Sequence, residues 1–378
     1  MRHSPGKFAP EATRLPARPI LAGLPPTRFR GISRTVALAV AVAVLAAAAV
    51  LLVVASQSTA PTGTASTDQG DIATYTRIVD HMRQGQDYYA AAHVELIHGA
   101  YGTRSVFNWR LPALSWFTSR LPSLAWASAM LEMAAAGAIL LAFHWLRACG
   151  RAVAFISVPA LVLNLVACVA PDAVLFADIV AGLLIFISAS AYGAKWPVLG
   201  FAAALLALFV RELAAPYVLI CVFFALRERR QLETAAWLAG LAAFAAYFAW
   251  HCAMVKAQLG ALDVAYPESW LQFGGPRFVL DTAAFNGVFI TAPLWVTAIL
   301  VPLALFGLLA WRGEGSARAG FTVAVYLALF LFVGKRFDYY WGALYTPLLM
   351  LGLPFLPGAV RDLAGALHRR SPAPVLIH

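Results

Sequence analysis

The chain has 378 residues, of which 61% are hydrophobic and only 12% are charged, with a formal net charge of +10. This balance excludes an ordinary soluble domain and is typical of a chain that lies mostly in lipid. The positive charge does not indicate a nucleic-acid partner, because the basic residues form short dispersed clusters and no continuous face. The four cysteines form no CxxC pair and have no histidine at metal-ligand spacing, so we interpret them as small core residues.

Residues 1–34 form a basic segment with six prolines and seven Lys or Arg against one acid, Glu11. Without apolar periodicity, this composition predicts a disordered cytosolic tail. The apolar run 36–55 follows directly and is long enough to span a bilayer, so we expect the first membrane helix there. A cleaved signal peptide is the alternative, since small residues follow the run.

Nine further apolar segments follow along the chain, and with 36–55 they predict an all-α, polytopic bundle of about ten spans. They cover residues 121–146, 152–169, 173–192, 197–210, 213–226, 234–254, 287–311, 321–333 and 341–356. The predicted transmembrane domain is 35–360, followed by a cytosolic C-terminal tail, 361–378. Both ends are expected in the cytosol, with the protein in the plasma (inner) membrane as a multi-pass protein.

Segments 197–210 and 213–226 are short, about 21 Å each against a hydrocarbon core of about 30 Å. Joined as one span, they would bury Arg211 and Glu212 in the bilayer and move every later loop to the other side. Kept as two spans, they place eight later basic residues in the cytosol: Arg227, Arg229, Arg230, Arg312, Arg318, Arg361, Arg369 and Arg370. Four fall outside: Lys256, Arg277, Lys335 and Arg336. The positive-inside rule therefore favours two short spans.

Two predicted outer loops are longer than turns. The first, 57–120, contains apolar residues at three-to-four-residue spacing and predicts a helix lying in the membrane interface: Ile72, Tyr75, Val79 and Met82. The second, 255–286, predicts an interfacial loop with an aromatic anchor: Tyr266, Trp270 and Phe273.

Most conspicuous ionisable residues fall on the outer face in this topology. Asp71 and Arg110 lie in the first outer loop, where composition alone favours a structural interpretation of each: Asp71 as an acid in the first turn of a helix and Arg110 as an interfacial anchor. Arg211 and Glu212 occupy a short turn between apolar helices, and the alternative there is a simple capping pair. Asp178 lies six residues into the predicted helix 173–192, and an acid inside a membrane span is a functional candidate by default.

Near the end of the chain, Lys335 and Arg336 precede Asp338 and Tyr340. These residues predict either an anion site under an aromatic lid or the aromatic belt of the last helix. A charged residue at a membrane boundary is individually inexpensive. The convergence of these residues from four outer segments is what predicts a pocket at the outer interface.

At this point the chain resembles the GT-C superfamily (mannosyltransferase-like), whose members are integral membrane glycosyltransferases that take a sugar from a polyprenyl-phosphate carrier. The resemblance covers most of the chain by layout. By motif it rests on short stretches at 71–75 with 85–89, 110–112, 210–214 and 340–342.

The resemblance implies that Asp71, by its position, is the catalytic base or a metal-site carboxylate. The chain has no sizeable C-terminal soluble domain and no second acid beside Asp71 except Asp68. It therefore leaves open whether a divalent cation, Mg²⁺ or Mn²⁺, takes part, and which acceptor is used: a glycan, a lipid or a protein.

The expected reaction is transfer of a sugar from a polyprenyl phosphate on the outer face, as a hexosyltransferase would perform it. An acceptor hydroxyl needs a carboxylate to take its proton, and the departing phosphate needs positive charge. Asp71 would supply the first, and Arg211 with Lys335 or Arg336 the second; Arg110, Glu212, Asp178 and Tyr340 complete the expected donor site. Inversion at the anomeric carbon is expected if Asp71 is the base. A transporter or lipid flippase, or a non-catalytic envelope scaffold, remain the alternatives.

Overall fold

The computed structural model describes residues 24–57, 70–265, 271–313 and 315–368. Within these ranges the chain is helical, and one isolated bridge between Leu271 and Val333 is the extended pairing present. The predicted all-α class is therefore confirmed. Five segments are long and apolar enough to cross a membrane: α1 (Arg34–Ser56), α5 (Leu124–Arg147), Arg151–Val169, α10 (Gln231–Gln258) and Thr346–His368.

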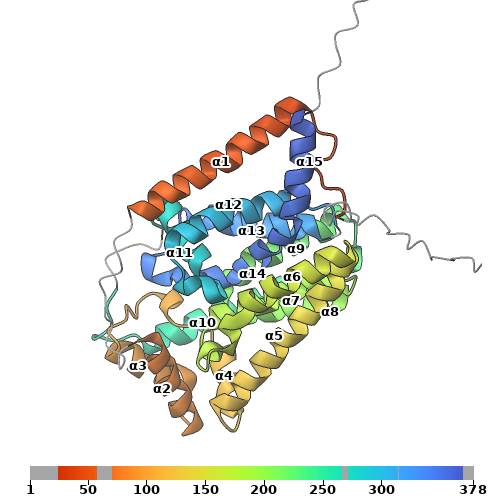
Figure 1. The fold of residues 1–378 in the computed structure, drawn as a ribbon. Coiled ribbons are helices and arrows are strands. Elements are labelled where there is room, and N and C mark those ends of the chain that lie inside the picture. The colour runs from red at the N-terminus through yellow and green to blue at the C-terminus, as the bar shows by residue number, and fades with distance from the viewer. Residues whose placement is uncertain (1–23, 58–69, 266–270, 314, 369–378) are drawn as a thin grey trace, which may run out of the picture.

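Other apolar helices are shorter than a bilayer is thick. They are α7 (Ala177–Gly193), α8 (Pro197–Val210), α12 (Leu294–Ala310) and α13 (Ser316–Phe330), and α9 (Ala215–Arg227) is shorter still. In Figure 1 these helices run side by side as one bundle. The three helices of the predicted first outer loop, α2 (Asp71–Arg83), α3 (Tyr88–His98) and α4 (Pro112–Arg120), lie together at one end of it.

Helix α7 lies at the centre of the bundle and is buried on nearly all sides. It pairs with α8, where the Ser188 hydroxyl donates to the Gly200 carbonyl at 2.6 Å. Small residues permit such close approaches between membrane helices. On another side, a Cβ at Gly182 would lie 2.1 Å from the Ala343 carbonyl oxygen, so this glycine allows the last helical segments to pack directly on α7.

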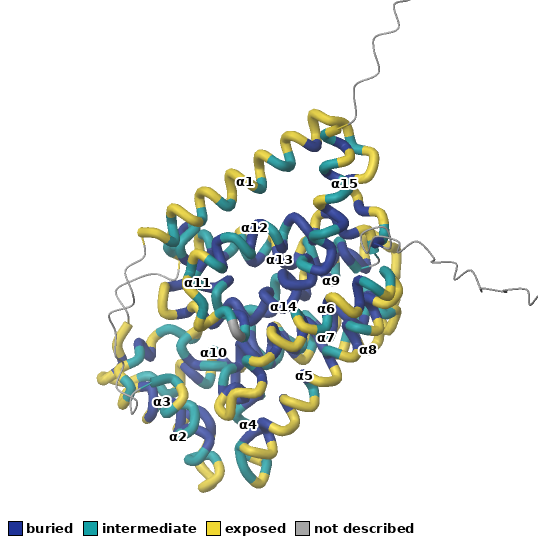
Figure 2. The backbone as a smooth tube through the Cα atoms, in the orientation of Figure 1, coloured by how far each residue is buried: buried dark blue, intermediate teal, exposed yellow. Residues whose placement is uncertain are grey.

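The first helix contrasts with this core. Helix α1 lies along one edge of the molecule, and Figure 2 shows it exposed along most of its length. Its exposed side chains are apolar, with Leu45 69% exposed. A helix with that composition and exposure satisfies its backbone internally and suits contact with lipid.

The segment before α1 differs from the predicted disordered tail. Residues 24–33 are described, and they pack against the bundle. The Thr27 backbone N–H and hydroxyl donate to one Asp362 carboxylate oxygen at 2.7 and 2.9 Å, and the Arg28 N–H donates to the Ala310 carbonyl at 2.9 Å. Asp362 lies in α15 (Leu356–His368), so part of the predicted C-terminal tail is also helical. Residues 1–23 lie outside the described ranges.

Several predicted spans begin or break differently in the structure; segment 287–311, for example, starts with the 3-10 helix η6 (Gly287–Thr291), and α12 begins only at Leu294. Segment 173–192 starts with the short 3-10 helix η4 (Ala173–Leu175), and α7 begins only at Ala177. Segment 341–356 is not one helix but four pieces: η7 (Arg336–Leu344), α14 (Thr346–Met350), η8 (Leu353–Phe355) and the start of α15. Pro347 and Pro354 are each the second residue of a new piece, because proline cannot continue the hydrogen bonding of the preceding turn.

The described parts of the two predicted outer segments contain helices joined by non-helical stretches. In α2, Val79 is buried and Tyr75 is half-buried, whereas Ile72 is exposed. In the second loop, α11 (Gly275–Ala284) follows the glycine pair and Phe273 is exposed. The aromatic residues Tyr266 and Trp270 lie outside the described residues.

Candidate functional site

A buried ion cluster joins α7 to the turn after α8. The Arg211 guanidinium donates from Nε to Asp178 Oδ1 and from Nη1 to Glu212 Oε1, both at 2.8 Å. Arg211 and Asp178 are each 1% exposed. Asp178 is the second residue of α7, not a mid-helix residue as predicted, because the helix begins four residues later than the apolar segment. The cluster therefore sits at one end of the bundle.

Arg110 reaches the same end of the bundle from the first outer loop. Its Nη2 donates to the Tyr340 hydroxyl at 2.8 Å, and its Cζ lies 5.9 Å from the centroid of the Tyr75 ring. The guanidinium is half-buried, and no carboxylate of the described residues lies within 4.0 Å of it. Arg110 thus keeps a positive charge that no direct ion pair balances, in contrast to Arg211.

Tyr340 connects Arg110 to a buried acid. Its hydroxyl also donates to Asp338 Oδ1 at 3.4 Å, a long contact. The other carboxylate oxygen of Asp338 accepts from the Lys335 N–H at 3.1 Å. Burial raises the pKa of Asp338 to about 6, although that N–H and the charge of Arg110 oppose the rise. Asp338 therefore changes its charge near pH 6.

Tyr75 of helix α2 interacts electrostatically with the charged residues of the cluster. Burial raises its pKa to about 12, and the charges of Arg110, Asp71, Arg211 and Asp178 all act on its phenol. Its ring also contacts Phe176 edge to face at 6.4 Å, and Phe176 contacts Tyr340 at 5.8 Å. One aromatic path therefore runs from α2 across the cluster to η7.

Asp71 is the first residue of α2, where its charge is favoured by the helix dipole. It accepts a hydrogen bond from the Tyr101 hydroxyl and remains half-buried. Asp68, the acid nearest to it in sequence, lies outside the described residues. Asp71 and Arg110 are thus two charged groups outside the Asp178–Arg211–Glu212 cluster that combine partial burial with remaining accessible surface.

Lys335 and Arg336 are placed differently from each other. The Lys335 side chain is buried, with its Nζ 5.9 Å from the centroid of the Phe337 ring. Arg336 has a side chain that is 62% exposed and points to Asp281, at 3.6 Å from Nε to Oδ2. The structure therefore brings Arg110, Asp178, Arg211, Glu212 and Tyr340 together and leaves Arg336 at the rim, whereas Asp71 is linked to them through Tyr75, on which both Asp71 and Arg110 act.

The contacts of three members of the site did not follow from sequence reasoning. Tyr75 stood out as an apolar residue of a helix face, and Asp338 as one of the residues of a possible anion site, without the partners that the structure gives them. Trp341, whose ring centroid is 5.9 Å from the Arg211 Cζ, counted as the start of a span. The three-residue spacing of Lys335 and Asp338 is the signal that could have indicated a capped turn holding the acid inward.

A divalent cation takes several oxygen ligands from carboxylates and carbonyls. No three His, Cys, Asp or Glu side chains come together in the ranges that the structure describes. The described residues thus do not form a ready cation site, and the chemistry below uses none.

The arrangement offers one accessible carboxylate, one accessible guanidinium without a carboxylate partner, and a second guanidinium neutralised by two acids. Such groups can accept a proton and hold an anion at the same interface. No family model, curated protein or solved structure matches this chain.

Proposed function

We propose that this protein is an integral membrane glycosyltransferase of the GT-C kind, which moves a sugar from a polyprenyl-phosphate carrier to an acceptor on the outer face of the membrane. The observation that carries the proposal is the state of Arg110. It is a half-buried guanidinium with no carboxylate within 4.0 Å among the described residues, and it shares the region around Tyr75 with Asp71.

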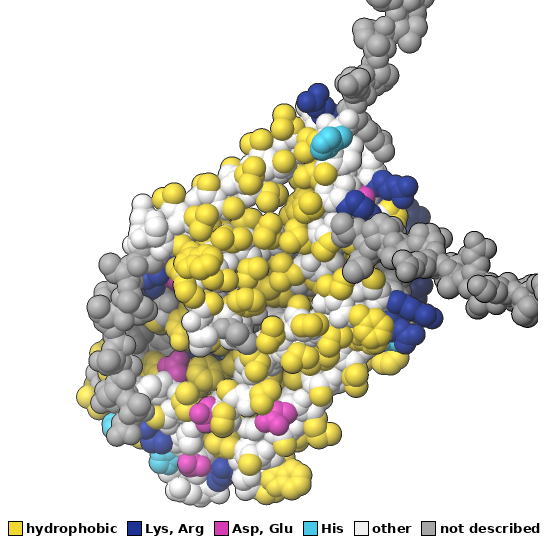
Figure 3. Space-filling model, in the orientation of Figure 1, with side chains coloured by type: hydrophobic (Ala, Val, Ile, Leu, Met, Phe, Trp, Pro, Cys, Tyr) yellow, Lys and Arg dark blue, Asp and Glu magenta, His cyan; other side chains and the backbone are white. Residues whose placement is uncertain are grey.

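The proposed membrane orientation draws on the charge distribution. Figure 3 shows a broad apolar surface between basic side chains at one end of the molecule and a mixture of acidic, basic and histidine side chains at the α2 end. Helices α5 and α9 end on the exposed basic residues Arg147 and Arg227, and the exposed Arg312 lies just after α12. Basic residues gather on the cytosolic side of membrane proteins, which supports both tails in the cytosol and α2 outside, in the plasma (inner) membrane.

The proposed reaction begins with the acceptor hydroxyl beside Asp71. The hydroxyl oxygen forms a bond to the anomeric carbon as its proton passes to the Asp71 carboxylate, and the bond from that carbon to the phosphate oxygen breaks. The electron pair leaves with the lipid phosphate, whose added negative charge Arg110 stabilises. Attack from the face opposite the phosphate inverts the anomeric configuration.

The remaining residues hold these two groups in place. Arg211 donates hydrogen bonds to Asp178 and Glu212. We therefore assign it to holding α7 against the turn after α8 and not to binding the phosphate. Tyr340 orients Arg110 through its hydroxyl. Because the donor's lipid stays in the bilayer while its sugar stands at the headgroup level, both reactants can meet at this end of the bundle.

The test is sugar transfer in proteoliposomes with a panel of labelled polyprenyl-phosphate sugars. We expect Asp71→Asn to lower turnover by about 10²–10⁴-fold, the usual contribution of a general base. Asp80→Asn is the matched control, since Asp80 lies on the same helix with a side chain 50% exposed and only a 3.5 Å pair with Arg83. It should transfer sugar at the wild-type rate.

Each other result has a definite meaning. Transfer that persists in Asp71→Asn would remove Asp71 as the base while keeping the enzyme class, and retained anomeric configuration would do the same. Absence of transfer with every donor would refute the proposed function and favour transport or a scaffold role.

A further inference from the structure

Three tyrosines surround Arg110, and two of them form hydrogen bonds with it. The Tyr88 hydroxyl donates to the Arg110 backbone carbonyl, and the Tyr340 hydroxyl accepts from the guanidinium at 2.8 Å. The third, Tyr75, has its ring centroid 5.9 Å from the Arg110 Cζ. Among the residues that the structure describes, none forms a hydrogen bond with the Tyr75 hydroxyl. Two tyrosines thus hold the arginine in place, and the third keeps an unengaged donor beside it.

Tyr75 also faces the proposed base. Asp71 and Tyr75 are four residues apart on α2 and therefore lie on the same face of the helix. Among the charges that act on the Tyr75 phenol, Arg110 acts most strongly and Asp71 next. Burial raises the pKa of Tyr75 to about 12, so the phenol keeps its proton at neutral pH. The hydroxyl is consequently a hydrogen-bond donor and not a second base.

The surroundings of Tyr75 leave its hydroxyl within reach of a ligand. The ring is half-buried and packs edge to face on Phe176 at 6.4 Å. The hydroxyl oxygen, however, is not one of the fully enclosed polar atoms and keeps accessible surface. A tyrosine hydroxyl in a partly buried place normally has a hydrogen-bond partner. The geometry is therefore that of a fixed ring with an accessible donor at the candidate site.

We propose that the Tyr75 hydroxyl donates a hydrogen bond to the phosphate of the lipid carrier, at the oxygen that separates from the anomeric carbon. This inference rests on the proposed function and adds a second donor beside Arg110. When the bond from the anomeric carbon to that oxygen breaks, its electron pair stays on the oxygen as new negative charge. Tyr75 stabilises this charge and keeps its own proton, while the acceptor's proton passes to Asp71. A donor aimed at developing charge acts mainly on the transition state.

The first test is the turnover of Tyr75→Phe, which removes the hydroxyl and keeps the ring. We expect kcat to fall by about 10²–10³-fold, the usual effect of removing one donor from such a site, with little change in the KM of the donor. Tyr339→Phe is the matched control, because Tyr339 is 43% exposed and only its ring contacts Phe285 and Tyr340. It should transfer sugar at the wild-type rate.

The second test measures binding of radiolabelled polyprenyl phosphate to the full chain in detergent, without turnover. Tyr75→Phe should weaken this binding by about 10–100-fold, the usual effect of losing a hydrogen bond to a charged group. Binding of the corresponding polyprenyl alcohol should stay the same, because it has no phosphate. This comparison separates a phosphate contact from a change in the packing of α2, which would affect both lipids.

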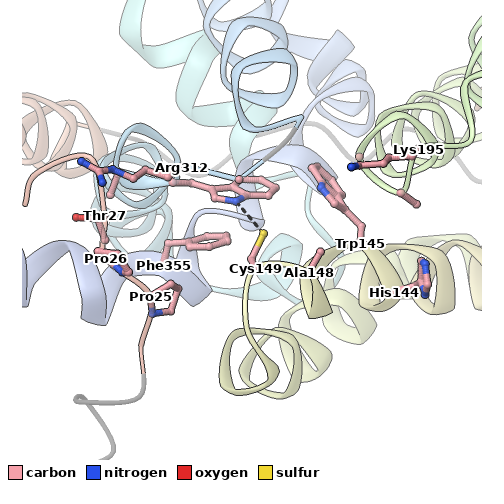
Figure 4. A pocket seen from close by; sticks show the side chains of 15 residues that line it. Pro25, Pro26, Thr27, His144, Trp145, Ala148, Cys149, Lys195, Arg312 and Phe355 are labelled. Atoms are coloured by element: carbon pink, nitrogen blue, oxygen red, sulfur yellow. Dashed lines mark hydrogen bonds between the residues drawn. The ribbon is translucent and has the colours of Figure 1, made fainter.

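A cavity at the opposite end of the bundle provides a further control. It has a volume of about 560 Å³ and lies between the ends of α5, α7 and α12, with Arg312 at one side (Figure 4). Gly193 lines it, and this residue is about 22 Å along α7 from Asp178 at the helical rise. Arg312→Gln should therefore bind polyprenyl phosphate like the wild type. Weaker binding in Arg312→Gln and unchanged binding in Tyr75→Phe would place the phosphate in this cavity and overturn the inference.

The remaining outcomes separate the inference from the proposed function. If Tyr75→Phe turns over and binds polyprenyl phosphate like the wild type, the inference is wrong and the enzyme class stands. Equal weakening of phosphate and alcohol binding would also overturn it, since the hydroxyl would then act through packing. If the wild type neither transfers sugar nor binds polyprenyl phosphate, the proposed function itself is refuted, and the inference with it.

Discussion

Arg110 and Arg211 have the same side chain but opposite electrostatic surroundings. Arg211 is neutralised by Asp178 and Glu212, whereas Arg110 has a tyrosine hydroxyl and a backbone carbonyl as hydrogen-bond partners. Removing one partner of a buried pair leaves an uncompensated charge, which costs far more than losing an exposed cation. The two arginines should therefore respond differently to the same substitution.

We expect Arg211→Gln to lower the free energy of unfolding by about 3–5 kcal/mol, because Asp178 is left buried without its partner. Arg110→Gln should change stability little and should weaken inhibition of transfer by free polyprenyl phosphate. Denaturant unfolding and inhibition assays measure the two effects. Arg120→Gln is the control, since Arg120 is exposed at the end of α4. Similar stability losses at positions 110 and 211 would contradict this division of roles.

Asp338 should give the protein a pH dependence near neutrality. Its pKa is about 6 in the folded protein and about 3.9 in the unfolded chain, so the folded state holds the proton more tightly. Its contribution to stability is therefore complete below about pH 4 and is lost as the pH rises through 6. Asp338→Asn keeps an oxygen acceptor for the Lys335 N–H and should flatten the stability profile between pH 4 and 7. If the free energy of unfolding, measured in urea, depends on pH in Asp338→Asn as it does in the wild type, the assignment is refuted.

Among the helices, the contact of α7 with η7 positions Tyr340 and hence Arg110. Gly182 permits this contact, because a Cβ there would lie 2.1 Å from the Ala343 carbonyl oxygen. We expect Gly182→Ala to cost about 1–3 kcal/mol by overpacking and to lower transfer, as measured by thermal unfolding and by the transfer assay. Gly137→Ala, on α5 with no atom within 4 Å of the added Cβ, should be neutral or slightly stabilising. Equal effects at both glycines would show that η7 does not depend on this contact.

The bounds of a helix could be predicted well from the sequence where a helix-starting or charged residue lies at each end. The range 197–210 is reproduced as α8, since Pro197 opens the helix and a charged residue follows its last turn. Prediction from the sequence failed over 341–356, where an apolar composition conceals four short pieces separated at glycine and proline. Hydropathy records burial but not the backbone breaks within a buried segment.

For the site, sequence reasoning could gather charged residues on one face but could not assign their partners. The pairing of Asp178 with Arg211 depends on where α7 begins, and that boundary was misplaced by four residues. Arg336 was grouped with Lys335 because they are adjacent in the chain, yet one is exposed and the other buried. Adjacent residues of a turn face opposite directions, which a topology argument does not resolve.

For the whole molecule, the proposed orientation predicts which ends react from outside the cell. In a background without the native cysteines, Arg120→Cys at the end of α4 should react with a membrane-impermeant maleimide in intact cells. Arg227→Cys at the end of α9 should react only after the cells are opened, because basic ends stay in the cytosol. The reverse pattern would invert the orientation and place the Asp71 end in the cytosol.

The Asp178–Arg211 pair also bears on how the protein is made. These partners are 33 residues apart in the chain, so α7 emerges from the ribosome carrying its acid before the matching arginine exists. An ionised residue near the end of a membrane helix costs less than the about 2.5–3.5 kcal/mol of one at the helix centre, but Asp178 stays unfavourable as long as no cation pairs with it. That cost disappears only when α8 and the turn after it have folded back beside α7. The three helices α7, α8 and α9 should therefore leave the translocation machinery together, after Asp178 and Arg211 have formed their ion pair.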